Sequence, residues 1–119
     1  MTRLPGNRYQ NYHAHVYFDR NSLAAARVLC TRAGELFGVE VGRFHQKPVG
    51  PHPQWSCQLA FDAAQFDDLI PWLEVNRQGL TILVHGLTGE DLADHTEHAS
   101  WLGEPAELDL SIFKRYQPS

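Results

Sequence analysis

Residues 12–18 read Tyr-His-Ala-His-Val-Tyr-Phe, and this stretch decides the predicted fold. Aromatic and β-branched side chains dominate it, which is typical of a β-strand. Because strand side chains alternate between two faces, Val16 and Phe18 are expected on one face, with His13 and His15 on the other. The stretch therefore predicts a sheet that is apolar on one face and carries imidazoles on the other.

Outward from this strand, the sequence alternates between helical and extended patterns. The predicted elements, in chain order, are a helix from residue 21 or 22 to 37, a strand over 39–45, a loop over 46–55, a strand over 56–61, a helix over 62–76 and a strand over 80–85. Pro71 is expected to kink or restart the second helix, because proline lacks the N–H that continues the helical ladder. Residues 86–119 are expected to be mostly loop, with one helical turn near 90–98.

The order strand, helix, strand, strand, helix, strand is that of the ferredoxin-like βαββαβ fold. We therefore expect an α+β domain with a four-stranded antiparallel sheet and both helices on one face. The chain of 119 residues fits a single domain over 1–119. In the first helix, apolar residues at helical spacing predict a buried stripe made of Leu23, Ala26, Leu29, Ala33 and Leu36.

Composition argues against several classes of function. Lys and Arg total 10 against 14 Asp and Glu, and the resulting net charge of −4 is unlike that of a nucleic-acid-coating protein. The apolar runs are too short to cross a bilayer, and the N-terminus lacks an apolar signal region, so a cytoplasmic protein is expected. Two cysteines, Cys30 and Cys57, make neither a disulfide framework nor a zinc ribbon. No P-loop, G-x-G-x-x-G or G-x-S-x-G motif is present, which leaves phosphate binding and that class of hydrolase without support.

Seven histidines are the unusual feature of this composition. In the predicted topology strands one and three run against strands two and four, so several element ends meet at one end of the sheet. Five of the histidines fall at that end, at positions 13, 15, 45, 52 and 85. A single histidine is more often a surface or hydrogen-bonded side chain than a ligand, but imidazole clusters commonly hold zinc or iron. The convergence therefore predicts a metal site.

The segment Asp94-His95-Thr96-Glu97-His98 can be interpreted in two ways. It can supply a carboxylate and a ligand, or it can form a capped turn that closes over the site. We favour a structural role, in which a carboxylate orients a ligating imidazole.

Four segments resemble the DOPA 4,5-dioxygenase family, and the likeness extends from about residue 12 to residue 113. They are Tyr-His-Ala-His-Val-Tyr-Phe-Asp over 12–19, His-Gln-Lys-Pro-Val-Gly-Pro-His-Pro over 45–53, Asn-Arg-Gln-Gly-Leu over 76–80 and Asp-His-Thr-Glu-His-Ala-Ser-Trp-Leu-Gly over 94–103. The Pro-Val-Gly-Pro-His-Pro block is the specific signature. One departure is Gly86, where the family pattern has proline after the histidine.

The resemblance implies an extradiol ring-opening dioxygenase that cleaves a small catechol such as DOPA with O₂. Its cofactor would be non-haem Fe(II), with zinc as an ion that the purified protein can carry. The resemblance also implies a homodimer, in which the open sheet faces of two chains pack together as a dimeric α/β barrel. The residues agree, because Tyr17 and Leu83 are expected on a sheet face that no helix covers.

The resemblance also suggests roles for the histidines. His15, His52 and His85 are expected to be the metal ligands, with His45 or His13 as the catalytic acid and base. The usual non-haem iron site has two histidines and one carboxylate. A three-histidine site, or one completed by Glu40 or Asp94, therefore stays open.

Two other functions fit the same residues. The first is a non-catalytic metal- or small-ligand-binding dimer on the same scaffold, because one fold hosts many functions. Tight zinc in a closed four-ligand shell would mark it. The second is a small hydrolase or isomerase with a histidine base and no metal, whose activity a chelator would leave intact.

Overall fold

The structure is a computed structural model, and it describes residues 4–113. Its elements, in chain order, are β1 (Asn11–Phe18), α1 (Leu23–Phe37), β2 (Glu40–His45), β3 (Trp55–Asp62), α2 (Ala63–Asn76), β4 (Ile82–Gly86), α3 (Asp91–Asp94), β5 (Ala99–Leu102) and the 3₁₀ helix η1 (Leu110–Ile112). The first six elements repeat the predicted order, and α3 lies within the helical turn predicted near 90–98. The α+β class is therefore confirmed.

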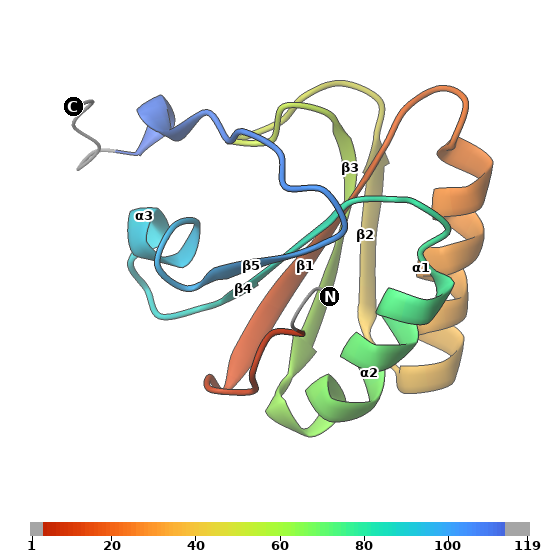
Figure 1. Cartoon of the computed structure of the whole chain (residues 1–119), viewed down its shortest axis with the longest axis horizontal. Helices are drawn as coiled ribbons and strands as arrows, with labels where there is room; N and C mark the ends of the chain where they lie inside the picture. Colours follow the sequence, from red (N-terminus) through yellow and green to blue (C-terminus); the bar gives the residue numbers. More distant parts are fainter. Residues whose placement is uncertain (1–3, 114–119) are drawn as a thin grey trace.

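The sheet has five antiparallel strands in the order β2-β3-β1-β4-β5, and the prediction of four strands is wrong. The additional strand β5 lies in a segment that was expected to be loop, and it pairs with β4 from Ile82 opposite Leu102 to His85 opposite Ala99. Its four residues, Ala-Ser-Trp-Leu, are too few to show the alternation by which a strand is recognised. In Figure 1, α1 and α2 cover one face of the sheet, while α3 lies on the other side of the molecule.

The face of β1 that packs against the helices is the predicted one. Val16 and Phe18 are buried in the core, and Ile82 and Val84 of β4 join them. Helix α2 buries Phe66, Leu69, Ile70 and Leu73, as expected. His13 and His15 of β1 therefore project from the opposite face, because neighbouring residues of a strand alternate between the two faces.

Two predictions about apolar residues are wrong. Leu36 is exposed on α1, and Cys30 takes a place in the buried stripe instead. Tyr17 and Leu83, expected on an uncovered face, are 1% and 0% exposed in the single chain. The Tyr17 ring contacts Trp101 of β5, and Leu83 lies opposite Trp101 in the sheet. The added strand and the loops near it thus cover this region, which removes the exposed apolar face as an argument for a dimer.

Local signals explain where both long helices begin or end. Helix α1 ends at Gly38, which has a left-handed φ of 71° that glycine adopts without strain. Helix α2 begins at Asp62, whose carboxylate accepts a hydrogen bond from the Gln65 backbone, while the Gln65 side chain accepts one from Asp62 N–H. Pro71 lies inside α2, which is one continuous helix and does not restart there.

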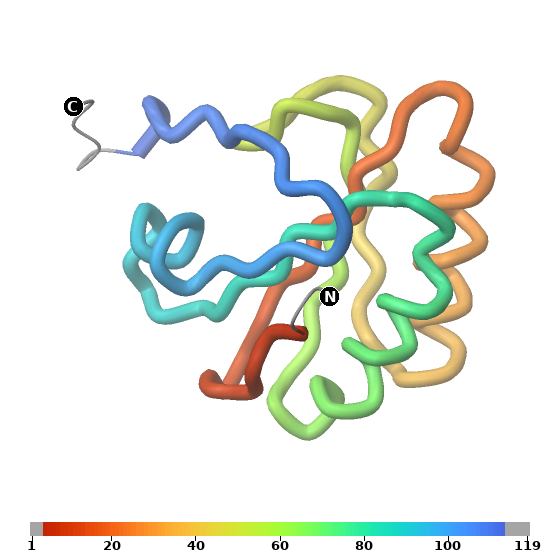
Figure 2. Tube along the Cα trace, in the orientation of Figure 1, coloured from red at the N-terminus to blue at the C-terminus, as the bar shows by residue number. Residues whose placement is uncertain are grey.

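The segment after β5 crosses toward the loop between β2 and β3, as the tube in Figure 2 shows. The Asp109 N–H donates to the Pro51 carbonyl at 2.8 Å and joins the two segments. Further along, the Phe113 ring stacks on His95 at 5.0 Å. This C-terminal segment therefore helps to hold the loop that carries His52.

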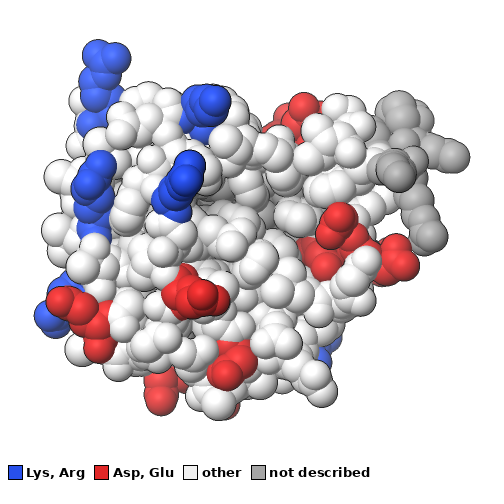
Figure 3. All heavy atoms as spheres, turned by 180° about the vertical axis from the view of Figure 1, so that it is seen from behind, with Lys and Arg blue, Asp and Glu red and all other residues white. Residues whose placement is uncertain are grey.

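Among residues 4–113, no helix is long and apolar enough to span a bilayer. In Figure 3, which views the molecule from behind, most basic side chains lie as separate groups on the upper left part of the face, and acidic groups lie mostly below them and to the right. This face thus has mixed charge.

Candidate metal centre

One row of residues across the sheet forms the floor of the histidine site. Glu40 lies opposite Ala60, Ala60 opposite His13, His13 opposite His85, and His85 opposite Ala99. Directly opposite residues project from the same face of a sheet. The two alanines flank the histidine pair, so small side chains leave space beside both imidazoles.

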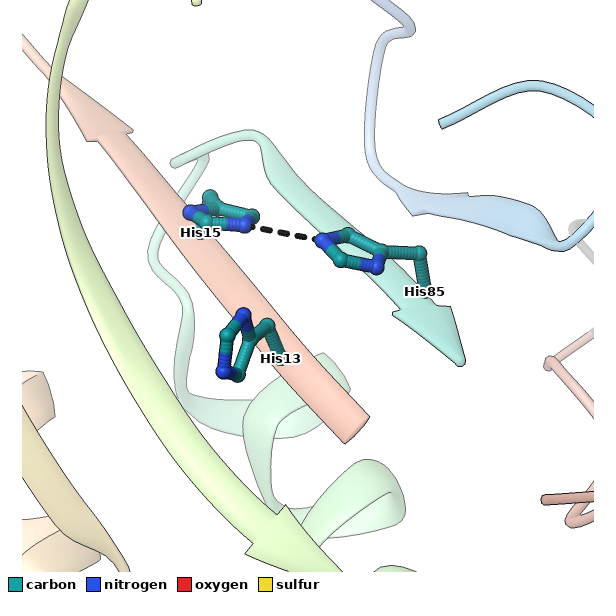
Figure 4. Close-up of side chains that lie close together, drawn as sticks. All are labelled: His13, His15 and His85. Carbon is teal, nitrogen blue, oxygen red and sulfur yellow. Dashed lines mark hydrogen bonds between the residues drawn. The ribbon is translucent and has the colours of Figure 1, made fainter. Parts of the chain in front are cut away.

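Three of the histidines lie close together on this face of the sheet. His13 and His15 come from β1 and His85 from β4, and Figure 4 shows their rings close together. A nitrogen of each ring lies within 4.8 Å of the other two. The closest pair is His15 Nε2 and His85 Nε2, which are 3.0 Å apart.

Two further histidine rings border this triad. The His52 ring lies 4.1 Å from His15 between centroids, and the His95 ring lies 4.3 Å from His85. His52 arrives on the loop between β2 and β3, and His95 immediately follows α3. The structure thus brings together four of the five histidines predicted to converge, and adds His95.

The fifth predicted histidine, His45, ends β2 opposite Ser56 and makes no ring contact with the cluster among the described residues. The sequence left open whether the segment over 94–98 supplies a ligand or forms a capped turn, and it did not indicate which of its two histidines would join the cluster, because that depends on the turn after α3. Of the two, His98 is turned elsewhere: His98 Nδ1 and Tyr9 Oη are 2.7 Å apart.

Backbone carbonyls fix a proton at Nδ1 of two rings. His85 Nδ1 lies 3.0 Å from the Gly86 carbonyl, and His95 Nδ1 lies 2.8 Å from the Asp91 carbonyl. A carbonyl only accepts, so each Nδ1 carries a proton, and in the neutral His85 ring Nε2 therefore keeps its lone pair. His85 therefore accepts a hydrogen bond from His15 Nε2–H, and its own Nε2 is ready to bind an ion.

Burial favours the neutral form of His15, His52 and His85. His15 and His85 are 5% and 2% exposed. Burial lowers the pKa of His85 from 6.5 to about 4, and that of His52 to about 4 as well. Burial, followed by the neighbouring imidazoles His52 and His85, holds the pKa of His15 well below 6.5. Neutral imidazole is the form that binds metals, so protons compete weakly for these nitrogens at neutral pH.

The two carboxylates considered from the sequence lie outside the converging nitrogens. Asp94 is buried, and its oxygens accept hydrogen bonds from Thr88 N–H and Oγ1–H. These hydrogen bonds hold together the connection between β4 and α3, in which Thr88 lies. Glu40 shares the sheet row with His13 and raises its pKa, but burial and His95 outweigh this effect, so the pKa of His13 is lowered. A cavity of about 510 Å³ borders both His13 and Glu40.

The donor set fits a transition-metal ion. Imidazole nitrogens bind zinc at about 2.0–2.1 Å, so two ligands of one ion lie roughly 3 to 3.5 Å apart. His15 and His85 already have this separation, at 3.0 Å. The second nitrogen of His85 also donates to a carbonyl, as in most protein metal sites. His13, His15 and His85 can therefore hold a metal ion.

Comparison with known proteins places this site in a family. The model of the Dopa 4,5-dioxygenase family matches residues 12–112, which include all of the histidines described above. The chain belongs to this family. One curated relative and one solved structure, reported below, carry the name dioxygenase.

Two curated relatives and one solved structure support this membership. The chain is 32% identical over 111 residues to the DOPA 4,5-dioxygenase of Amanita muscaria, covering 86% of this chain and 49% of that protein. It is 38% identical over 116 residues to an uncharacterized 21.2 kDa protein of Botryotinia fuckeliana. This match covers 87% of this chain and 63% of that protein. The chain thus spans about half to two thirds of the length of these relatives.

The solved structure is a crystal structure of a candidate dioxygenase from Nostoc punctiforme. It superposes with a TM-score of 0.84 at 44% identity and covers 87% of this chain and 90% of that one. This likeness supports the fold.

The departure from the family pattern at Gly86 has a structural counterpart. Gly86 N–H donates to the His98 carbonyl at 3.2 Å, a bond that proline cannot make. The Tyr9 ring also lies against Gly86, where a Cβ would be 2.4 Å from Tyr9 Cδ2. Within this chain, the hydrogen bond to His98 and the Tyr9 ring thus hold the backbone after His85.

Proposed function

We propose that this member of the Dopa 4,5-dioxygenase family is an extradiol dioxygenase that opens the ring of a catechol such as DOPA. The observation that carries the proposal is the convergence of His13, His15 and His85 on one sheet face. The Amanita relative is named for the same reaction. Here the activity is assigned to the metal site that these imidazoles form.

The proposed cofactor is Fe(II). When bound, it supplies a Lewis acid and a redox centre at which a catechol and O₂ can react. The protein supplies a rigid set of neutral donors, because β1 and β4 are central, hydrogen-bonded strands and burial disfavours protonation of the rings.

Two residues are common to the predicted ligand set and to the observed triad. His15 and His85 belong to both, and we place them at the centre of the site. The third ligand differs, since the family resemblance suggests His52 and the nitrogen positions favour His13. The imidazole of this pair that does not bind the ion is then available to hydrogen-bond the catechol.

Oxygen consumption tests the proposal. Metal-free protein is loaded anaerobically with Fe(II), and O₂ uptake and absorbance are followed after DOPA or a simple catechol is added. We expect stoichiometric uptake with a new yellow product. The Zn(II)-loaded protein and the His15→Ala variant should show neither.

His98→Gln is the matched control, because His98 bonds Tyr9 outside the cluster and should leave oxygen uptake near that of the parent protein. No uptake with any catechol, despite one firmly bound iron per chain, would contradict the proposal. The site would then be a binding site for a metal or small ligand.

A further inference from the structure

We propose that His52 is a hydrogen-bond donor to the bound substrate and not a metal ligand, and that Tyr17 is the positioning residue that holds it in this state. This inference rests on the proposed function, because it assigns a role at the same site. It also assigns the third ligand position to His13.

The Tyr17–His52 contact is short and buried. Tyr17 Oη and His52 Nδ1 are 2.7 Å apart, and the two residues are 1% and 7% exposed. Among the described residues, Tyr17 Oη has no other hydrogen-bond partner. The direction of this one bond therefore decides whether the hydroxyl proton is satisfied.

Hydrogen-bond accounting favours Tyr17 as the donor. If His52 Nδ1–H donated to Tyr17, the buried tyrosine proton would have no acceptor among the described residues, and a buried polar group without a partner is costly. If Tyr17 donates, its O–H and His52 Nδ1 satisfy each other.

This direction determines the other nitrogen of His52. Neutral imidazole carries one N–H, so a ring that accepts at Nδ1 carries its proton on Nε2. Such a ring has no lone pair to offer an ion from Nε2. His85 has the opposite tautomer, because its Nδ1 donates to the Gly86 carbonyl.

His15 differs from His52 in one respect. Its Nε2 donates to His85 when no ion is present, but among residues 4–113 its Nδ1 has no hydrogen-bond partner that would fix the tautomer. The proton of His15 can move to Nδ1 when an ion replaces that hydrogen bond. The Nδ1 of His52 is held by Tyr17 and offers no such freedom.

The nitrogen positions support this assignment independently. The group of nitrogens within 4.8 Å of one another contains His13, His15 and His85, and His52 is outside it. The His52 ring still lies 4.1 Å from the His15 ring, beside the proposed ion. Its Nε2–H has no acceptor among the described residues and is available to an oxygen of a bound catechol.

Two measurements test the inference without requiring turnover. First, ¹⁵N–¹H correlation spectra of the Zn(II)-loaded protein report the tautomer of each histidine, and we expect the Nε2–H form for His52. In Tyr17→Phe the His52 signals should shift toward a mixture of tautomers, an effect that general loosening of the fold would not produce at this ring alone.

Second, Zn(II) titration compares His52→Gln with His85→Gln and His13→Gln. Loss of a ligand should weaken zinc binding by more than about 100-fold. His52→Gln should weaken it by no more than about 10-fold, which is the smaller end of the loss in metal affinity found for residues that lie beside a metal site without binding the ion. In the Fe(II) enzyme, His52→Gln should mainly lower kcat/KM for the catechol.

An Nδ1–H tautomer for His52, or zinc loss in His52→Gln as large as in His85→Gln, would overturn the inference. The spectrum of the unmodified protein decides even if a variant fails to fold. Failure of the dioxygenase proposal is distinguishable, since it would appear as absent oxygen uptake with the tautomer and titration results unchanged.

Discussion

Gly86 follows His85 at the end of β4, and the Tyr9 ring occupies the space that a side chain would need. A Cβ on Gly86 would lie 2.4 Å from Tyr9 Cδ2 and 2.5 Å from Cγ. We expect Gly86→Ala to lower the free energy of unfolding by about 1–3 kcal/mol, because an overpacked site must move a ring or the strand. Urea unfolding measures the change.

Gly6→Ala is the control for this prediction. A Cβ at Gly6 would have Arg8 Nε as its nearest atom, at 3.5 Å, which is ordinary contact. Equal stability of the two variants would show that Tyr9 does not restrict the backbone beside His85.

Single residues of the site were only partly predictable from the sequence. His13, His15 and His85 follow from strand alternation and topology, because β-strands fix which side chains share a face. His95 depends on how the chain turns after α3, and the role of Asp94 depends on its bonds to Thr88. No periodic pattern encodes contacts of that kind.

At the level of elements, the capping box at the start of α2 contributes to the free energy of unfolding. Asp62 and Gln65 satisfy each other's backbone N–H groups in a capping box. We expect Asp62→Ala to lower the free energy of unfolding by about 1 kcal/mol, the usual cost of a lost N-cap. Asp68→Ala, an exposed position within the same helix, should change it by less than about 0.5 kcal/mol.

Thermal or chemical unfolding of the two variants checks this prediction. Identical midpoints for both would mean that packing of Phe66 and Leu69, and not the capping box, determines the stability of α2.

The long elements were predictable and the short ones were not. Helix α1 and helix α2 have strong start or stop signals, and β1 has clear alternation. Strand β5 has only four residues, and its pairing with β4 is a tertiary contact that no local sequence pattern predicts. The same contact explains why Tyr17 and Leu83 are covered, which the sequence could not indicate.

For the whole molecule, the buried imidazoles link stability to pH. His52 and His85 have pKa values of about 4 in the folded protein, against 6.5 for an unperturbed histidine. Between pH 6.5 and pH 4 the unfolded chain binds more protons than the folded chain. The free energy of unfolding of the metal-free protein should therefore fall as the pH decreases through this window.

Urea unfolding of chelator-treated protein at pH 7, 6, 5 and about 4.5 measures this effect. We expect the midpoint to decrease at each step, and to decrease less when bound metal keeps the imidazoles deprotonated. A midpoint that stays constant from pH 7 to 5 would show that these rings are solvated and not buried as described.

The central claim is that the histidines on one sheet face form a metal centre. The most direct measurement is an anomalous-difference map, recorded at the iron edge, of crystals of Fe(II)-loaded protein grown without oxygen. We predict one peak per chain, about 2.0–2.3 Å from the Nε2 atoms of His15 and His85. A peak elsewhere on the chain, or none despite stoichiometric iron in solution, would contradict the account.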